Sequence, residues 1–130
     1  VRPRARTWPY FHSEGRQVPH LRALRPDPLV EVHPAAAARF GIAEGDWVWV
    51  ENHLGRCKRV VKETPIVNER TASTDHAWWH PEAPGELEAG LYDLWDLTVE
   101  NLLPYDCGKT GFGANYKNTI CKIYRVAEGE

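Results

Sequence analysis

The chain has 130 residues, of which 42% are hydrophobic and 26% are charged, and its net charge is −2. This composition excludes wholesale disorder and fits a single packed domain spanning residues 1–130. The near-neutral charge argues against a nucleic-acid partner, which would need a clustered basic surface, and no apolar run approaches the ~20 residues of a membrane span.

Residues 1–28 are rich in proline, arginine and aromatic side chains. Proline removes a backbone donor and restricts the residue before it, so this composition predicts extended segments and turns rather than a helix. The excess of arginine has two interpretations: a solvated arm or edge that docks on another domain, or a site for an anionic group such as pyrophosphate. These arginines are Arg2, Arg4, Arg6, Arg16, Arg22 and Arg25.

The next segment predicts a strand and then a short helix. Residues 29–33 (LVEVH) alternate apolar and polar side chains, as a half-buried strand does. Pro34 suits the first position of a helix, four alanines follow it, and Gly41 is typical of a helix end. The sequence therefore predicts a helix over residues 34–40.

A β-hairpin is predicted for the region that follows. Residues 47–51 and 56–62 are rich in β-forming side chains and are separated by a compact His-Leu-Gly turn. Trp47 and Trp49 share one face of their strand because side chains alternate along it. Core packing is the expected role of this pair, rather than stacking on a ligand.

The second half of the chain is less regular. Residues 71–76 predict a short strand that leads into the unusual sequence DHAWWHPE. Residues 91–103 are apolar and ambiguous between helix and strand, with Trp95 and Leu102 expected to be buried. Residues 104–118 contain several glycine and proline breakers among Tyr, Asn and Lys, and they predict a loop close to a polar group.

Residues 122–126 (KIYRV) predict a last strand. The predicted elements are thus mostly strands, with one or two short helices and long irregular loops, and such loops in a compact domain usually have a function. The predicted fold class is mainly β, a barrel-like domain with crossing connections.

No self-contained active site is visible. The odd number of cysteines forms no CxxC pair, so free buried thiols are expected rather than a zinc or iron–sulfur site. His76 and His80 have i, i+4 spacing, but Pro81 follows at once, so loop histidines are favoured over a metal site. No methionine is present either. We therefore expect a chain excised from a longer enzyme, without a catalytic residue or metal ligand of its own.

What the sequence does contain is a set of side chains suited to a binding surface. They combine hydrogen-bond donors and acceptors with flat aromatic faces, a mixture that a pterin or a guanine requires. For the tryptophans, core packing is an equal alternative. The predicted contact residues are Ser13, Glu14, Gln17, His76, Trp78, Trp79, Asn101, Tyr116 and Lys117.

Residues 27–64 resemble the C-terminal, molybdopterin-dinucleotide-binding domain of the dimethyl-sulfoxide-reductase family of molybdenum and tungsten oxidoreductases. In that family a strand, a helix after His-Pro, a Gly-Ile turn and a Gly-Asp-x-Val hairpin recur. Residues 11–24 are similar to its segment leading to the cofactor, and residues 76–79 (HAWW) to its His-Gly-Trp-Trp, with alanine in place of glycine. Asn101 and residues 115–117 resemble its two late cofactor-contacting elements, so the resemblance spans nearly the whole chain in order.

The resemblance implies a double-psi β-barrel and two pyranopterin guanine dinucleotides that bind one molybdenum or tungsten. It also implies that the metal's protein ligand, any iron–sulfur cluster and the substrate funnel belong to other domains, and that an iron–sulfur electron-transfer subunit is a further partner. The hairpin is closest to the branch with thiosulfate or polysulfide reductases and acetylene hydratase. The isolated domain is expected to be catalytically inactive.

Two other interpretations stay open from the sequence. One is a stand-alone barrel module that binds a nucleotide or a protein, and its support is the missing catalytic set. The other is a small independent enzyme of the double-psi barrel class, for which no nucleophile motif is found. Fold-level analogy carries part of the choice between them.

Overall fold

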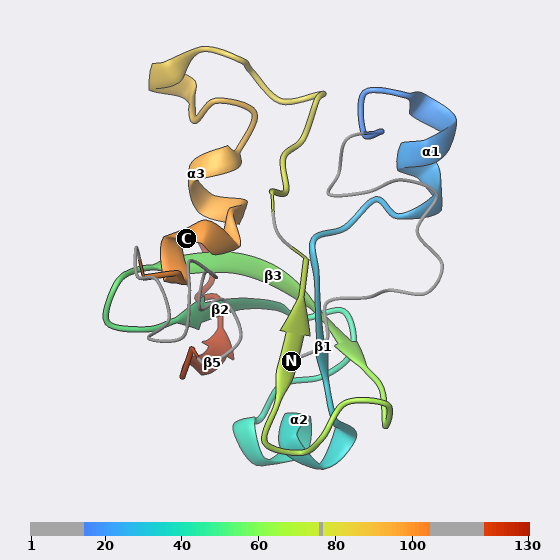
Figure 1. The fold of residues 1–130 in the computed structure, drawn as a ribbon, viewed down its shortest axis with the longest axis vertical. Helices are drawn as coiled ribbons and strands as arrows, with labels where there is room; N and C mark the ends of the chain where they lie inside the picture. The colour runs from blue at the N-terminus through green and yellow to red at the C-terminus, as the bar shows by residue number, and fades with distance from the viewer. Residues whose placement is uncertain (1–14, 76, 105–118) are drawn as a thin grey trace, which may run out of the picture.

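The computed structural model describes residues 15–75, 77–104 and 119–130 (Figure 1). Within this part of the chain a mixed sheet of five strands lies at the centre, in the order β4-β1-β3-β2-β5. The strands are β1 (Leu29–Val32), β2 (Trp47–Glu51), β3 (Arg56–Glu63), β4 (Ala72–Thr74) and β5 (Lys122–Arg125).

Only the pair β1–β3 is parallel; β1–β4, β2–β3 and β2–β5 are antiparallel. A parallel pair needs a crossover connection, which α2 (Pro34–Phe40) and β2 provide between β1 and β3. The predicted strand-rich fold with a crossing connection is therefore confirmed. The predicted barrel closure is not seen, because β4 and β5 form the two edges of an open sheet in the described residues.

The helix α2 begins and ends where the sequence predicts. Pro34 is at its first position, and the Nδ1 atom of His33 accepts a hydrogen bond from the N–H of Ala35 at 3.1 Å. Gly41 ends the helix at a φ of 66°, in the left-handed region that glycine adopts without strain. Figure 1 shows α2 at one end of the sheet, and α1 and α3 toward the other.

A helix within residues 15–28 was not predicted, yet α1 (Pro19–Leu24) forms there. The expectation of extended chain was wrong because Pro19 is at the first helical position, where its missing N–H costs nothing. The next proline, Pro26, follows the helix end. Residues 91–103 form short helical turns: α3 (Leu94–Leu97) and the 3₁₀ helix η2 (Val99–Leu102), preceded by η1 (Leu87–Ala89).

The main core lies on the face of the sheet shared by valines of β1, β2 and β3, with residues of α2 and η2 packed on it. It contains Leu102, as predicted, whereas Trp95 is 51% exposed and that expectation was wrong. Trp49 is buried under the guanidinium of Arg56, whose Cζ lies 3.8 Å from the ring centroid, but Trp47 is 42% exposed. Core packing is thus confirmed for one tryptophan of the pair only.

Two features bear on the remaining expectations. Cys57 and Cys121 are free thiols, the first buried and the second partly buried, while Cys107 lies outside the described residues. None of the described helices is long and apolar enough to cross a membrane.

Candidate functional site

Five of the nine predicted contact residues lie outside the described part of the chain, and four lie within it. The first group is Ser13, Glu14, His76, Tyr116 and Lys117. The second is Gln17, Trp78, Trp79 and Asn101. The four described residues come from three segments, residues 15–26, 77–80 and 98–102, and buried polar contacts join these segments to one another.

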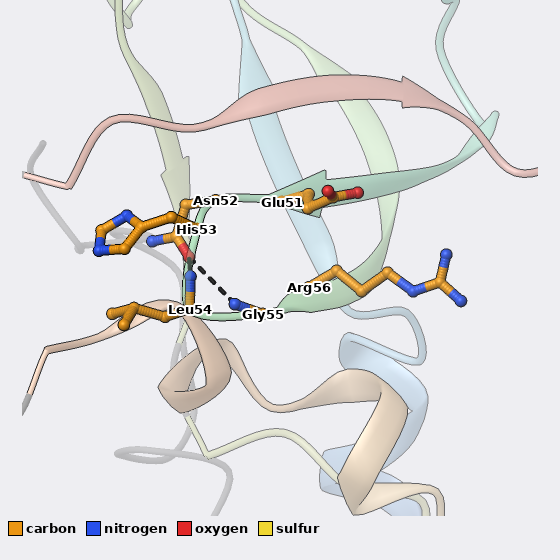
Figure 2. A pocket seen from close by; sticks show the side chains of 6 residues that line it. All are labelled: Glu51, Asn52, His53, Leu54, Gly55 and Arg56. Carbon is orange, nitrogen blue, oxygen red and sulfur yellow. Dashed lines mark hydrogen bonds between the residues drawn. The ribbon is translucent and has the colours of Figure 1, made fainter.

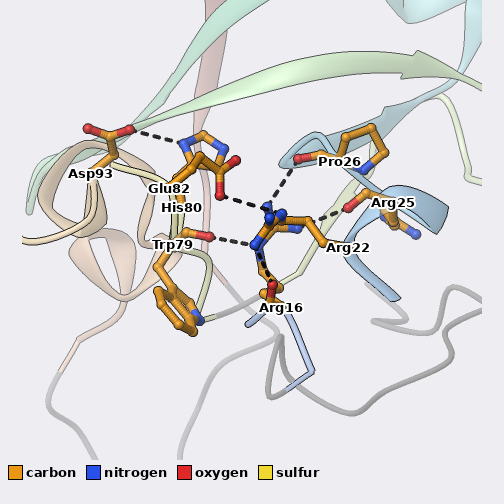
Figure 3. A network of polar contacts seen from close by, with 8 residues as sticks. All are labelled: Arg16, Arg22, Arg25, Pro26, Trp79, His80, Glu82 and Asp93. Atoms are coloured by element: carbon orange, nitrogen blue, oxygen red, sulfur yellow. Dashed lines mark hydrogen bonds and ion pairs between the residues drawn. The ribbon is translucent and has the colours of Figure 1, made fainter. Parts of the chain in front are cut away.

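Arg16 joins the first two segments (Figure 3). Its side chain is fully buried, and its Nε donates to the carbonyl oxygen of Trp79 at 2.7 Å. Nη1 donates to the carbonyl of Arg25 at 2.9 Å and Nη2 to that of Pro26 at 3.2 Å. Arg22 in turn donates to the carbonyl of Arg16 at 3.0 Å. Arg16 therefore determines where the backbone of Trp79 lies, a role that the arginine-rich composition alone did not indicate.

The two neighbouring tryptophans have opposite environments. Trp78 is fully buried, with the Cζ of Arg16 4.2 Å from its ring centroid, so it has no exposed face for a ligand in this structure. Trp79 is partly exposed and meets Tyr92 edge to face, with ring centroids 5.6 Å apart at 73°. Of the pair, Trp79 is the side chain with a free surface.

Tyr92 belongs to a strained turn. Leu91, Tyr92 and Asp93 have φ values of 50°, 60° and 60°. Since each non-glycine residue in this region costs roughly 1–2 kcal/mol, neighbouring contacts must hold the turn. The ring of Tyr92 packs on Gly85, where a Cβ would lie 2.5 Å from the ring and could not be accommodated.

His80 provides two further contacts to this turn. Its backbone N–H donates to the carbonyl of Tyr92 at 2.9 Å, and its Nδ1 lies 3.0 Å from the carboxylate of Asp93 (Figure 3). The carboxylate thereby fixes the orientation of the imidazole beside Trp79. Among the described residues, no group of three or more His, Cys, Asp or Glu side chains could hold a metal ion.

Ala77 stands where the resemblance has glycine, and its backbone explains why glycine suits the position. Its φ is 54°, and its N–H lies 3.2 Å from each carboxylate oxygen of Glu100, which joins residues 77–80 to η2. A Cβ is disfavoured at this φ. The segment therefore adopts the backbone that glycine prefers, with an alanine in it.

We expect Ala77→Gly to raise the free energy of unfolding by up to about 1 kcal/mol, because relief of left-handed strain exceeds the added chain entropy. Gly41→Ala is the matched control: at a φ of 66° it introduces the same strain with no atom within 4 Å of the new Cβ, and should destabilise by about 1 kcal/mol. Urea denaturation of both variants measures this. Destabilisation by Ala77→Gly would mean that the positive φ is not maintained.

Asn101 and Gln17 differ in how much of each is free to bind a ligand. The Nδ2 of Asn101 donates to the carbonyls of Arg56 at 3.0 Å and Trp95 at 2.8 Å. Both amide protons are thus used within the chain, and a ligand contact through Asn101 would involve its Oδ1. Gln17 is exposed on the turn ahead of α1.

A shallow pocket of about 340 Å³ lies at the end of the β2–β3 hairpin, lined by residues 51–56 (Figure 2). The Oδ1 of Asn52 accepts from the N–H groups of Leu54 and Gly55, at 2.9 and 3.2 Å, and its Nδ2 donates to Leu102 at 2.7 Å. Gly55 is required here, since a Cβ would lie 2.8 Å from the carbonyl oxygen of Asn101. The polar atoms of Asn52 therefore join the hairpin to η2 rather than pointing to a ligand.

Charged residues behind the 77–80 segment form a partly buried cluster. Arg25 pairs with Asp75 at 2.8 Å. Burial raises the pKa of the Asp75 carboxyl, and Arg25 and Arg59 oppose this rise. On β1, burial likewise raises the pKa of Glu31. The cluster lies at the point where the 15–26 segment and the end of β4 meet.

Comparison with known proteins identifies the domain. Residues 4–115 match the family model described as the molydopterin dinucleotide binding domain. The dopamine dehydroxylase of Eggerthella lenta is 47% identical over 73 residues, 56% of this chain and 7% of that protein. The acetylene hydratase of Syntrophotalea acetylenica is 34% identical over 107 residues, covering 72% of this chain and 15% of that protein.

A solved structure of similar fold supports the same assignment. The acetylene hydratase from Pelobacter acetylenicus matches with a TM-score of 0.84 and 29% identity, over 89% of this chain and 16% of that one. The chain thus spans 7% to 16% of the length of these relatives. Family match, relatives and fold agree with the resemblance seen in the sequence. The chain belongs to the dimethyl-sulfoxide-reductase family of molybdenum oxidoreductases, as its molybdopterin dinucleotide-binding domain.

Proposed function

We propose that this domain covers the cofactor of a larger oxidoreductase and orients it by hydrogen bonds and aromatic contact. The observation that carries the proposal is the junction at Trp79, a partly exposed indole whose backbone is held by a fully buried arginine, Arg16. A rigid aromatic face beside polar groups is the surface that a pterin or guanine ring system needs. The junction therefore fits the cofactor.

In this proposal the parent enzyme holds two pyranopterin guanine dinucleotides on one molybdenum or tungsten. An iron–sulfur cluster lies in another domain, an iron–sulfur subunit exchanges electrons with the enzyme, and the sheet closes into a double-psi β-barrel. The proposed contact residues remain Ser13, Glu14, Gln17, His76, Trp78, Trp79, Asn101, Tyr116 and Lys117, with buried Trp78 acting by packing beneath its neighbour.

When bound, the metal and its dithiolene sulfurs supply the redox chemistry. The residues of this chain act on position and environment. Trp79 provides a flat apolar wall that excludes water from one ring face, and Gln17 is exposed to donate or accept at a ring edge. Arg16 keeps the wall in place through its hydrogen bond to the Trp79 carbonyl. Isolated from the other domains, the chain is expected to catalyse no redox reaction.

The first test is the metal and pterin content of the full-length parent, purified without oxygen. About one molybdenum or tungsten and two pterin dinucleotides per chain would support the proposal. A folded parent with neither, after failed loading has been excluded, would favour the alternative of a stand-alone module that binds a nucleotide or a protein.

Trp79→Ala in the parent should lower cofactor retention about tenfold, because ring stacking contributes about 1–3 kcal/mol per base. Its effect on the melting temperature should be smaller, since the side chain is only partly buried. Trp47→Ala, which removes an exposed tryptophan from β2, is the control and should change neither quantity. Loss of stability with normal cofactor content would make Trp79 a packing residue only.

A further inference from the structure

Arg59 is a buried cation in the centre of the sheet. It lies on β3 opposite Val48 of β2, on the same face as Cys57 and Val61, and its side chain is fully buried. A guanidinium stays charged at any ordinary pH, so burying it costs free energy unless acceptors and countercharge surround it. The partners of Arg59 therefore decide whether the fold alone accounts for it.

The hydrogen bonds of Arg59 are incomplete. Nη2 donates to the carbonyl of Asp75 at 2.9 Å. Nε and Nη1 are buried and have no hydrogen-bond partner within residues 15–75, 77–104 and 119–130. The nearest polar side chain is the thiol of Cys57, whose pKa is raised by burial. It is a neutral group and a weak acceptor. Arg16, the other fully buried arginine, donates instead from all three of its nitrogens.

The two carboxylates that act on Arg59 electrostatically are engaged elsewhere. Asp75 forms its ion pair with Arg25 at 2.8 Å. Glu100 accepts from the N–H of Ala77 and from the hydroxyl of Thr98. Within the described residues, the positive charge of Arg59 therefore lacks a dedicated counterion.

We propose that Arg59 binds a phosphate oxygen of the dinucleotide cofactor through Nε and Nη1, an inference that rests on the proposed function. Arginine N–H groups suit phosphate oxygens in charge and geometry. Arg59 already bonds to Asp75, at the end of the strand that leads to the Trp79 segment, so the contact lies behind the proposed aromatic wall. Because the guanidinium is buried, covering residues must shift when the phosphate binds.

The test compares the full-length parent in cofactor-free and loaded forms. Arg59→Met keeps the length of the side chain and removes the charge. In the cofactor-free form its melting temperature should equal or exceed that of the wild type, because replacing an incompletely paired buried charge with an apolar group is often neutral or stabilising. Its cofactor content should fall about tenfold, the loss expected for hydrogen bonds to a charged group. Arg16→Met, the matched control, should lower the melting temperature in both forms.

Titration of the cofactor-free parent with guanosine diphosphate and with guanosine identifies the contacted group. Arg59→Met should weaken binding of guanosine diphosphate about tenfold and leave guanosine binding unchanged. Equal or absent binding of guanosine diphosphate by wild type and variant would overturn the proposal. So would a cofactor-free melting temperature that falls as far as that of Arg16→Met, which would make Arg59 a structural residue. A wild-type parent without pterin would instead contradict the proposed function, and the titration would still decide the role of Arg59.

Discussion

Trp78→Ala should lower the free energy of unfolding by about 3–5 kcal/mol, the cost of removing a fully buried large aromatic side chain. Trp78 has no exposed surface and lies against the guanidinium of Arg16, so both the packing and the cation–π contact are lost. Urea denaturation of the 130-residue chain measures the change. The effect is predicted to be the largest of any single tryptophan in the described residues, because the others are less buried.

Two controls separate packing from ring chemistry. Trp78→Phe keeps an apolar ring and should recover a large part of the loss. Trp47→Ala, at a 42% exposed site, should cost less than about 1 kcal/mol. A loss below about 1 kcal/mol for Trp78→Ala would show that the 77–80 segment is not packed on the domain in solution.

Arg16→Met is the second large effect, with an expected loss of about 3 kcal/mol. The variant leaves the carbonyls of Trp79, Arg25 and Pro26 without their donor, and each unsatisfied group costs about 1–3 kcal/mol when buried and less when partly hydrated. Arg22→Met is the control, since Arg22 makes one hydrogen bond and a 3.6 Å ion pair with Glu82 on a more exposed surface. That control should lose less than about 1.5 kcal/mol.

A double-mutant cycle between Arg16 and Trp78 resolves their direct interaction. The cation–π pair is desolvated, so the coupling free energy should be about 1–2 kcal/mol. Additive losses would mean that the two residues stabilise the segment independently. In either case the retention of cofactor by the parent should fall with Arg16→Met, because Trp79 loses the contact that positions its backbone.

Local signals in the sequence determined several elements to within a residue or two. The helix from Pro34 to Phe40 was predictable because its first-position proline, its alanines and the left-handed Gly41 act within a few residues of one another. The β2–β3 hairpin was predictable because alternation and turn spacing are equally local. The resemblance of five ordered segments likewise identified the family, since it needs no knowledge of which segments touch.

The tertiary structure alone decided which predicted residues are free to bind and which are buried. Trp78 and Trp79 are adjacent and identical in type, yet one is sealed under Arg16 and the other is partly exposed. Asn101 spends its amide protons on Arg56 and Trp95, distant or irregular segments that no periodicity connects to it.

The same holds for the parallel pairing of β1 with β3, and for the burial of Arg16 and Arg59, two arginines that composition alone would place at the surface. These outcomes depend on contacts between residues far apart in the chain, whose free energies have no local signature. The sequence therefore determined the elements and the family, and long-range packing decided the site.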